Sequence, residues 1–133
     1  MSDWNEEQPI YRQLRDRVVE GILQGSFPEG EPLPSVRQVA AEERINPITV
    51  SKAYQLLVDE GLLEKHRGLG MFVVNGALEA ARRAGREHFL SQEWPQVTKK
   101  IRQLDLNVET LLEQLAAPGG EDDPSATTPG ASE

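Results

Sequence analysis

The sequence predicts a mainly α-helical protein with one small β-hairpin: a winged helix-turn-helix domain followed by a short helical region. Two helices separated by a short turn are indicated over residues 35–60, which is the helix-turn-helix arrangement. A glycine-rich hairpin, the wing, is indicated directly after them over residues 62–74. Beyond the hairpin, apolar residues recur in alternating steps of four and three, which is the spacing of a helical packing seam.

The first predicted helix begins after Pro9 and runs to about Gln24. Gly25 and Pro28 end it, because neither residue continues a helix well. The spacing of its apolar residues predicts one face that packs against the rest of the domain. This stripe consists of Ile10, Leu14, Val18 and Ile22.

The second predicted helix is short and follows a turn-rich connection over residues 25–32. Ser35 and Gln38 have the spacing of a capping box, which favours a helix start at this point. The third helix begins at Asn46, a favourable N-cap, with Pro47 at the first helical position. Its apolar face is predicted to contain Val50, Ala53, Tyr54 and Leu57.

The opposite face of the third helix carries an isoleucine, Ile48, in its first turn. An outward-facing isoleucine suits a helix whose N-terminal end touches something, such as the methyl group of a thymine base. The alternative is an ordinary exposed apolar side chain, and such side chains are common on protein surfaces.

The hairpin has predicted strands over residues 62–66 and 71–74, and its tip contains Arg67, Gly68 and Gly70. The two glycines would let the backbone approach a phosphate closely. A narrow minor groove attracts arginine, so Arg67 is a candidate for that contact. The alternative for Arg67 is an ordinary turn residue.

Residues 76–116 are predicted to form two or three short helices, because Pro95 interrupts the pattern and Asn107 is a favourable N-cap. Their apolar stripe needs a partner surface, and a second copy of the same stripe is the simplest partner. We therefore expect this region to mediate dimerisation. The predicted seam consists of Leu90, Trp94, Val97, Ile101, Leu104, Val108, Leu111 and Leu115.

The last segment, residues 117–133, has four acidic and no basic side chains and almost no apolar ones. Such a segment cannot offset the entropy of ordering, so we expect it to be disordered. Half of the formal net charge of −8 lies in it. The remaining acidity means that any surface that binds phosphate must be a local patch.

The composition excludes several classes of protein. The chain has no cysteine, which excludes a disulfide framework and thiolate metal sites. No apolar run reaches the roughly 18 residues of a transmembrane helix. We expect a soluble, cytoplasmic protein with no membrane partner.

No catalytic arrangement is evident, so we expect neither an enzyme nor a cofactor. Ser35 has no histidine or lysine placed to activate it as a nucleophile. His66 and His88 lack companion ligands at a suitable spacing, so no metal site is expected. The stretch from Gly68 to Gly70 is not a nucleotide-binding loop, because no helix follows it.

Five segments together resemble the winged-helix domain of the GntR family of bacterial transcription regulators, in the same order and without an evident gap. They are PIYRQL (9–14), LPSVRQVA (33–40), NPITVSKAY (46–54), EGLL (60–63) and RGLGMFV (67–73). The short helical appendage is similar to that of the YtrA-like subfamily, in which it serves dimerisation. Asp105 stands where the resemblance predicts glycine.

The resemblance implies DNA-binding roles for residues of the helix-turn-helix and the wing. Arg37 matches an arginine of the second helix that family members use on DNA. Arg67 and Gly68 match wing-tip positions that enter the minor groove. The segment that reads bases in the major groove matches Asn46, Pro47, Ile48, Thr49 and Ser51.

For Arg37, Lys52 and Tyr54, a role in DNA binding must be weighed against an ordinary structural role. Arg37 could instead pair with Glu42 or Glu43, which lie nearby in the sequence. Lys52 lies on the outward face of the third helix and is expected to contact a phosphate, although alone it would be an ordinary surface lysine. Tyr54 is expected to belong to the core and not to stack on a base.

We therefore expect a homodimeric repressor that binds a double-stranded operator with two-fold symmetry. The half-sites would lie about one helical turn apart, or a multiple of that distance. The resemblance implies a nearby target operon, such as one encoding an ABC transporter. The alternative is a winged-helix adaptor that binds another protein through its acidic surface, without specific DNA readout. The sequence identifies no small-molecule effector.

Overall fold

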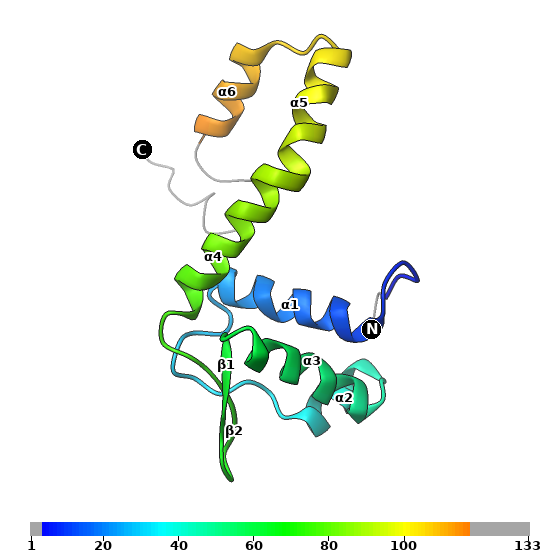
Figure 1. The fold of residues 1–133 in the computed structure, drawn as a ribbon, viewed down its shortest axis with the longest axis vertical. Coiled ribbons are helices and arrows are strands. Elements are labelled where there is room, and N and C mark those ends of the chain that lie inside the picture. Colours follow the sequence, from blue (N-terminus) through cyan, green and yellow to red (C-terminus); the bar gives the residue numbers. More distant parts are fainter. Residues whose placement is uncertain (1–3, 118–133) are drawn as a thin grey trace. The chain divides into compact units, whose positions relative to one another are not determined.

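The computed structural model describes residues 4–117, and the chain divides into two compact units between Phe89 and Leu90. The predicted acidic tail therefore lies almost wholly outside the described residues. The first unit contains α1 (Ile10–Gln24), α2 (Val36–Glu43), α3 (Pro47–Asp59), β1 (Leu63–His66), β2 (Gly70–Val73) and α4 (Ala77–His88) (Figure 1). A π-helical turn, η1 (Phe89–Glu93), precedes α5 (Trp94–Gln103) and α6 (Val108–Ala116). The predicted fold class, mainly helical with one hairpin, is confirmed.

The helix-turn-helix forms where the capping residues predict it. The Ser35 hydroxyl accepts a hydrogen bond from the backbone N–H of Gln38 at 3.0 Å. The Asn46 side chain accepts from the N–H of Ile48 at 2.8 Å, and Pro47 is the first residue of α3. Because these bonds satisfy N–H groups that have no partner within the helix, they fix the starts of α2 and α3.

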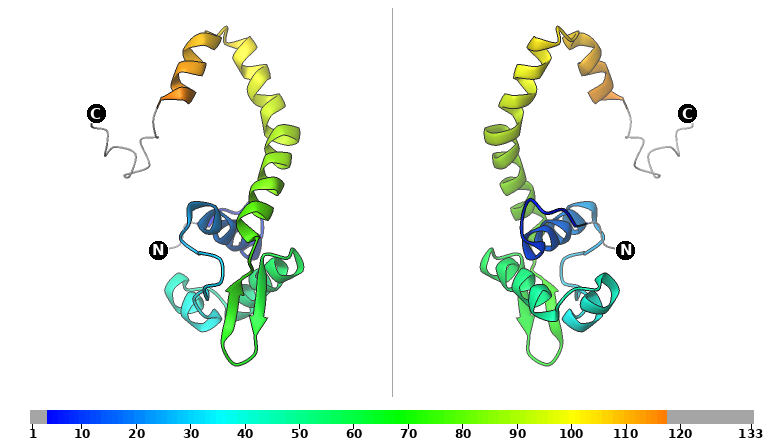
Figure 2. Two further views of the ribbon diagram at one scale, coloured as in Figure 1. Left: turned by 90° about the vertical axis from the view of Figure 1, so that its left-hand side faces the viewer. Right: turned by 90° about the vertical axis from the view of Figure 1, so that its right-hand side faces the viewer.

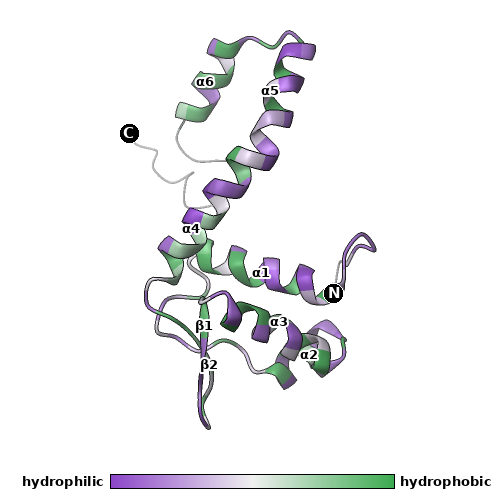
Figure 3. Ribbon diagram, in the orientation of Figure 1, coloured by the Kyte–Doolittle hydropathy of each residue, from purple (hydrophilic) through white to green (hydrophobic). Residues whose placement is uncertain are grey.

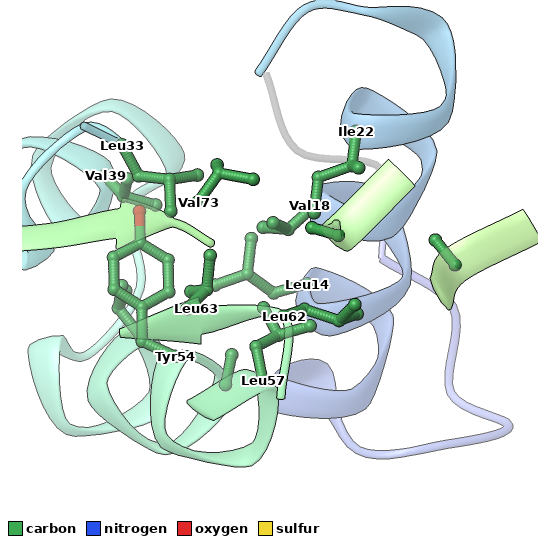
Figure 4. Packing of buried hydrophobic residues seen from close by; sticks show 14 of the residues in the cluster. Leu14, Val18, Ile22, Leu33, Val39, Tyr54, Leu57, Leu62, Leu63 and Val73 are labelled. Carbon is green, nitrogen blue, oxygen red and sulfur yellow. The ribbon is translucent and has the colours of Figure 1, made fainter. Parts of the chain in front are cut away.

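One apolar core holds the helices of the first unit together (Figure 4). Val50, Ala53 and Leu57 of α3 are fully buried, so the predicted inner face of this helix is confirmed. Tyr54 is also buried, and its hydroxyl donates to the carbonyl oxygen of Pro34 at 2.7 Å. Burial raises the pKa of Tyr54 to about 12, because the phenolate would lose its hydration. The tyrosine thus joins α3 to the segment that enters α2.

The wing is a two-stranded antiparallel hairpin in which Leu63 pairs with Val73 and His66 pairs with Gly70. The segment before α2 lies along the outer side of β2: the N–H of Leu33 donates to the carbonyl of Met71 at 2.8 Å. This pairing fixes the wing against the helix-turn-helix.

Helix α4 belongs to the first unit, so this unit continues past the expected boundary at residue 75. Ala77 and Ala81 are buried in the common core, where α4 packs against α1. The Glu29 carboxylate accepts from the N–H of Leu78 at 2.9 Å and so caps the start of α4. Hydrogen bonds from the backbone N–H groups of Gly76 and Leu78 hold the pKa of Glu29 below its usual value.

The prediction that Pro95 interrupts the helical pattern is wrong, because α4, η1 and α5 follow one another without a break over residues 77–103. Pro95 lies in the first turn of α5, directly after the π-helical turn, where its missing N–H is tolerated.

In the second unit, the helix start predicted at Asn107 is confirmed. The Asn107 side chain caps α6 by accepting from the N–H of Thr110 at 3.1 Å. Asp105 takes a left-handed conformation with φ of 53°, so the turn forms although glycine is absent. Apolar and polar segments alternate along α5 and α6 (Figure 3). None of the described residues from 90 to 117 is buried, in contrast to the first unit.

Candidate nucleic-acid interface

The start of α3 is exposed while its opposite face is anchored in the core. Ile48 is 72% exposed, and Asn46, Pro47 and Ser51 are exposed as well. Thr49 is half-buried. The five residues predicted to read bases therefore lie at the surface. The opposite face of the same helix is held in place by the apolar core.

Helix α3 and the wing border a common groove of about 280 Å³. Ser51 and Gln55 line it from α3, and Lys65 and Gly70 line it from the hairpin. Ser35, at the entry to α2, lines it as well. The groove brings the helix-turn-helix and the wing onto one face of the first unit, and the hairpin projects beyond the helices of this unit (Figure 2).

The tip of the wing presents Arg67 to solvent between the paired residues His66 and Gly70. Gly68 and Gly70 have φ of 76° and 106°, a region that favours glycine because other residues carry a Cβ. The His66 ring stacks on Phe72 with 4.0 Å between the ring centroids. This stack supports the hairpin immediately before its tip.

Arg37 is exposed on α2 and forms no ion pair within residues 4–117. The pairing proposed as its alternative is therefore absent from the described structure. Glu42 instead accepts from the Gln38 side chain at 3.3 Å, and Glu43 lies 3.7 Å from Arg17. The Arg37 guanidinium is left facing solvent.

Lys52 is exposed on α3, and its ammonium lies 4.7 Å from the centre of the Tyr11 ring on α1. This distance suits a cation–π contact. This contact could not be predicted from the sequence, because the two residues come from separate helices. Lys65 was also missed: its position on a short strand did not indicate which side of the hairpin faces α3.

The predicted dimerisation residues surround an apolar groove of about 550 Å³ between α5 and α6. Six of the eight line it: Trp94, Val97, Ile101, Val108, Leu111 and Leu115. Leu90 and Leu104 lie outside the groove lining but are 58% and 61% exposed. Leu112, also 58% exposed, lines the groove and was missed because it falls between the seam positions.

The described part of the chain contains neither a metal-binding cluster nor a helix that could span a membrane. Residues 4–117 contain no group of three or more His, Cys, Asp or Glu side chains arranged to hold a metal ion. The helices of this same segment are all too short or too polar to cross a membrane.

Comparison with known proteins identifies the first unit. The family described as bacterial regulatory proteins, gntR family, matches residues 10–73. The HTH-type transcriptional repressor YtrA of Bacillus subtilis (strain 168) is 44% identical over 69 residues, which cover 52% of this chain and 53% of YtrA. The uncharacterised HTH-type transcriptional regulator YhcF of the same organism is 27% identical over 112 residues, covering 84% of this chain and 91% of YhcF. The match thus spans about half the length of YtrA but most of YhcF.

Solved structures share the fold. A transcriptional regulator from Oenococcus oeni superposes with a TM-score of 0.69 at 24% identity, covering 87% of this chain and 98% of that one. The DNA-binding domain of AraR, in complex with operator ORE1, superposes with a TM-score of 0.50 at 26% identity, covering 56% of this chain and 93% of the domain. The winged helix-turn-helix of residues 10–73 is thus a domain of the type described by the gntR family of bacterial regulatory proteins.

Proposed function

We propose that this protein is a homodimeric transcriptional repressor that acts in the bacterial cytoplasm by binding a specific DNA operator. The observation that carries the proposal is the groove that α3, whose start is exposed, and the wing border together. The similarity to the repressor YtrA, and to the AraR domain that was solved with an operator, supports it.

In this proposal the first turn of α3 reads bases in the major groove. Ile48 contacts the methyl group of a thymine, because it is the most exposed apolar side chain of the helix. Asn46 uses its side-chain oxygen as the helix cap, so its amide NH₂ group is the part left to meet a base. Pro47, Thr49 and Ser51 complete the readout surface.

The cations around this surface are proposed to contact the DNA backbone and the minor groove. Arg37 and Lys52 bind phosphates on either side of the major groove, since both are exposed and neither forms an ion pair within the described residues. Arg67 enters the minor groove, and Gly68 and Gly70 let the wing backbone approach closely. Phosphate contacts fix the register, and base contacts then provide the specificity.

The second unit is proposed to join two copies through the exposed apolar residues of α5 and α6. A single chain leaves Val108, Leu112 and Leu115 56%, 58% and 79% exposed, and a second copy would cover them. The dimer would place two α3 helices in successive major grooves of a two-fold operator. We further propose that the regulated genes form a nearby operon, such as one encoding an ABC transporter.

Selection of bound duplexes from random DNA, using the full-length protein, tests this function. The enriched sequence should be two-fold symmetric, with half-sites about one helical turn apart or a multiple of that distance. Affinity for it should fall steeply with salt, because each neutralised phosphate releases about 0.9 counterions. Enrichment of no sequence, together with salt-independent interactions, would favour the protein-binding adaptor.

A further inference from the structure

The tip of the wing carries an exposed leucine that the proposed function does not use. Leu69 lies between Gly68 and Gly70 and is 72% exposed. Within the described part of the first unit, the other large apolar side chains that are exposed are Ile48 at 72% and Phe89 at 41%. The two most exposed ones therefore lie on α3 and on the wing, the elements that border the common groove.

The backbone of the tip holds Leu69 at the far end of the hairpin. The N–H of Leu69 donates to the carbonyl of His66 at 2.8 Å, which closes a four-residue turn. Gly68 occupies the third position of this turn with φ of 76°, as in a type II turn. Apart from each glycine and its two chain neighbours, no atom lies within 4 Å of the place that a Cβ would take on Gly68 or Gly70. The space beside the backbone on both sides of the leucine is therefore open.

The hairpin behind the tip is well supported. The His66 and Phe72 rings are stacked 4.0 Å apart with an interplanar angle of 13°. The His66 ring nitrogen Nε2 lies 2.8 Å from the Glu64 carboxylate, and the segment before α2 pairs with β2 along its other side. A side chain that separates stacked bases must be held firmly, and this support meets that requirement.

We propose that Leu69 enters the minor groove beside Arg67 as an apolar wedge and partly unstacks one base step. Leucine is among the side chains that proteins insert between base steps from the minor groove, which kinks the duplex away from the protein. The negative potential of the minor groove would attract Arg67. Leu69, two residues further along the chain, would then reach the base edges at the floor of the groove. This inference rests on the proposed DNA-binding function.

The wedge would give the operator a preference that involves no hydrogen bond to a base. Pyrimidine–purine steps such as TA unstack at a lower energetic cost than AA steps do. We therefore expect operators with a TA step under the wing to bind about tenfold more tightly than operators with an AA step there, within the usual effect of one base-pair change. The preference would belong to Leu69 and not to the readout residues of α3.

The test uses the full-length protein and its selected operator, built with either step under the wing. Dye pairs at the duplex ends report bending, and 2-aminopurine at the step reports unstacking. Leu69→Ala removes the wedge, and Leu69→Met keeps an apolar side chain of similar volume. Leu106→Ala is the matched control, since it also removes an exposed leucine, 42% accessible, from outside the wing.

The wild-type protein, Leu69→Met and Leu106→Ala should bend the TA operator by at least about 20° and raise the 2-aminopurine fluorescence. Leu69→Ala should still bind, but with little bend and nearly equal affinity for the two operators. Equal bending and equal step preference in Leu69→Ala and the wild type would overturn the wedge, as would unchanged 2-aminopurine fluorescence in the wild-type complex. Failure of the wild-type protein to select any operator would instead refute the proposed function.

Discussion

The two units of this protein use their apolar side chains in opposite ways. In the first unit, Val50, Ala53 and Leu57 are completely buried, and the exposed apolar residues are few. In the second, Leu104, Leu112 and Leu115 are 61%, 58% and 79% exposed, although α5 and α6 are strongly amphipathic. The first unit has its own buried core. The second unit instead leaves the apolar face of α5 and α6 exposed.

This difference in the burial of apolar side chains suits the two units to different roles. A unit with a closed core holds α3 and the wing in fixed positions, so that recognition depends on geometry set before binding. A unit with an open apolar face gains stability only when another surface covers that face. We infer that a partner surface covers the exposed apolar face of the second unit.

The largest effect is expected from charges placed on the open face. In the double variant Ile101→Asp, Val108→Asp, a dimer would bury four carboxylates in an apolar interface, each at a cost of several kcal/mol. Sedimentation should therefore show monomers. The control Gln96→Asp, Gln103→Asp adds the same charge at exposed polar positions of α5 and should remain dimeric. Persistent dimers in the first variant would place the interface elsewhere.

The next largest effect is expected from truncating a leucine, which should lower the free energy of unfolding much more in the first unit than in the second. Leu57→Ala removes a side chain with no exposed surface and should lower the free energy of unfolding by about 2–5 kcal/mol. Leu112→Ala, measured at concentrations where the monomer predominates, should change it by less than about 0.5 kcal/mol. Urea denaturation measures both values. A similar loss for the two variants would show that α6 is already buried in the single chain.

Removal of the wing arginine should affect DNA binding without affecting assembly. Arg67→Ala should weaken operator binding by about 1–3 kcal/mol, because a minor-groove contact is lost. Arg82→Ala removes the same charge from the exposed surface of α4 and should weaken binding much less. Titration of labelled operator gives both affinities, and sedimentation should show unchanged dimers. Equal affinities for the two variants would exclude the wing from the mechanism.

The smallest effect is a pH dependence confined to the first unit. The folded-state pKa of Glu29 lies below its ordinary value of 4.5, so the ionised carboxylate stabilises the fold. This contribution is fully present above pH 4.5 and is lost as the pH falls through the lowered pKa. Glu29→Gln should therefore be less stable than the wild type at pH 7, and the difference should shrink in acid.

Urea denaturation from pH 7 to pH 3 measures this difference. Glu31→Gln is the control, since it makes the same change of charge on a neighbouring exposed residue that does not cap α4. A pH-independent difference between Glu29→Gln and the wild type would show that the carboxylate charge does not stabilise α4.

Features encoded by neighbouring residues were predictable from the sequence. Ser35, Asn46 and Asn107 cap helices that begin one residue later, so the residue and its effect lie together in the chain. The inner face of α3 followed from helical periodicity alone. The glycines of the wing tip likewise indicated a turn at the place where it forms.

Features that depend on distant partners were not predictable. Ala77 and Ala81 attach α4 to the first unit, but small residues give little apolar signal until α1 is placed against them. The polar segment before α1 is also joined to this helix by hydrogen bonds that its composition does not indicate. Its backbone is held by Gln13, a buried side chain that accepts from the N–H of Asn5 at 3.0 Å and donates to its carbonyl at 2.8 Å.

The pairing of the segment before α2 with β2 has a consequence for solubility. A two-stranded hairpin alone would present unpaired backbone groups along both of its edges, where strands of other molecules can add. Here the bond from Leu33 to Met71 and the bridge from Pro32 to Phe72 cover the β2 edge. The β1 edge carries the charged side chains Glu64 and Lys65, which discourage strand addition. The wing is thereby protected from β-sheet aggregation while its tip stays free.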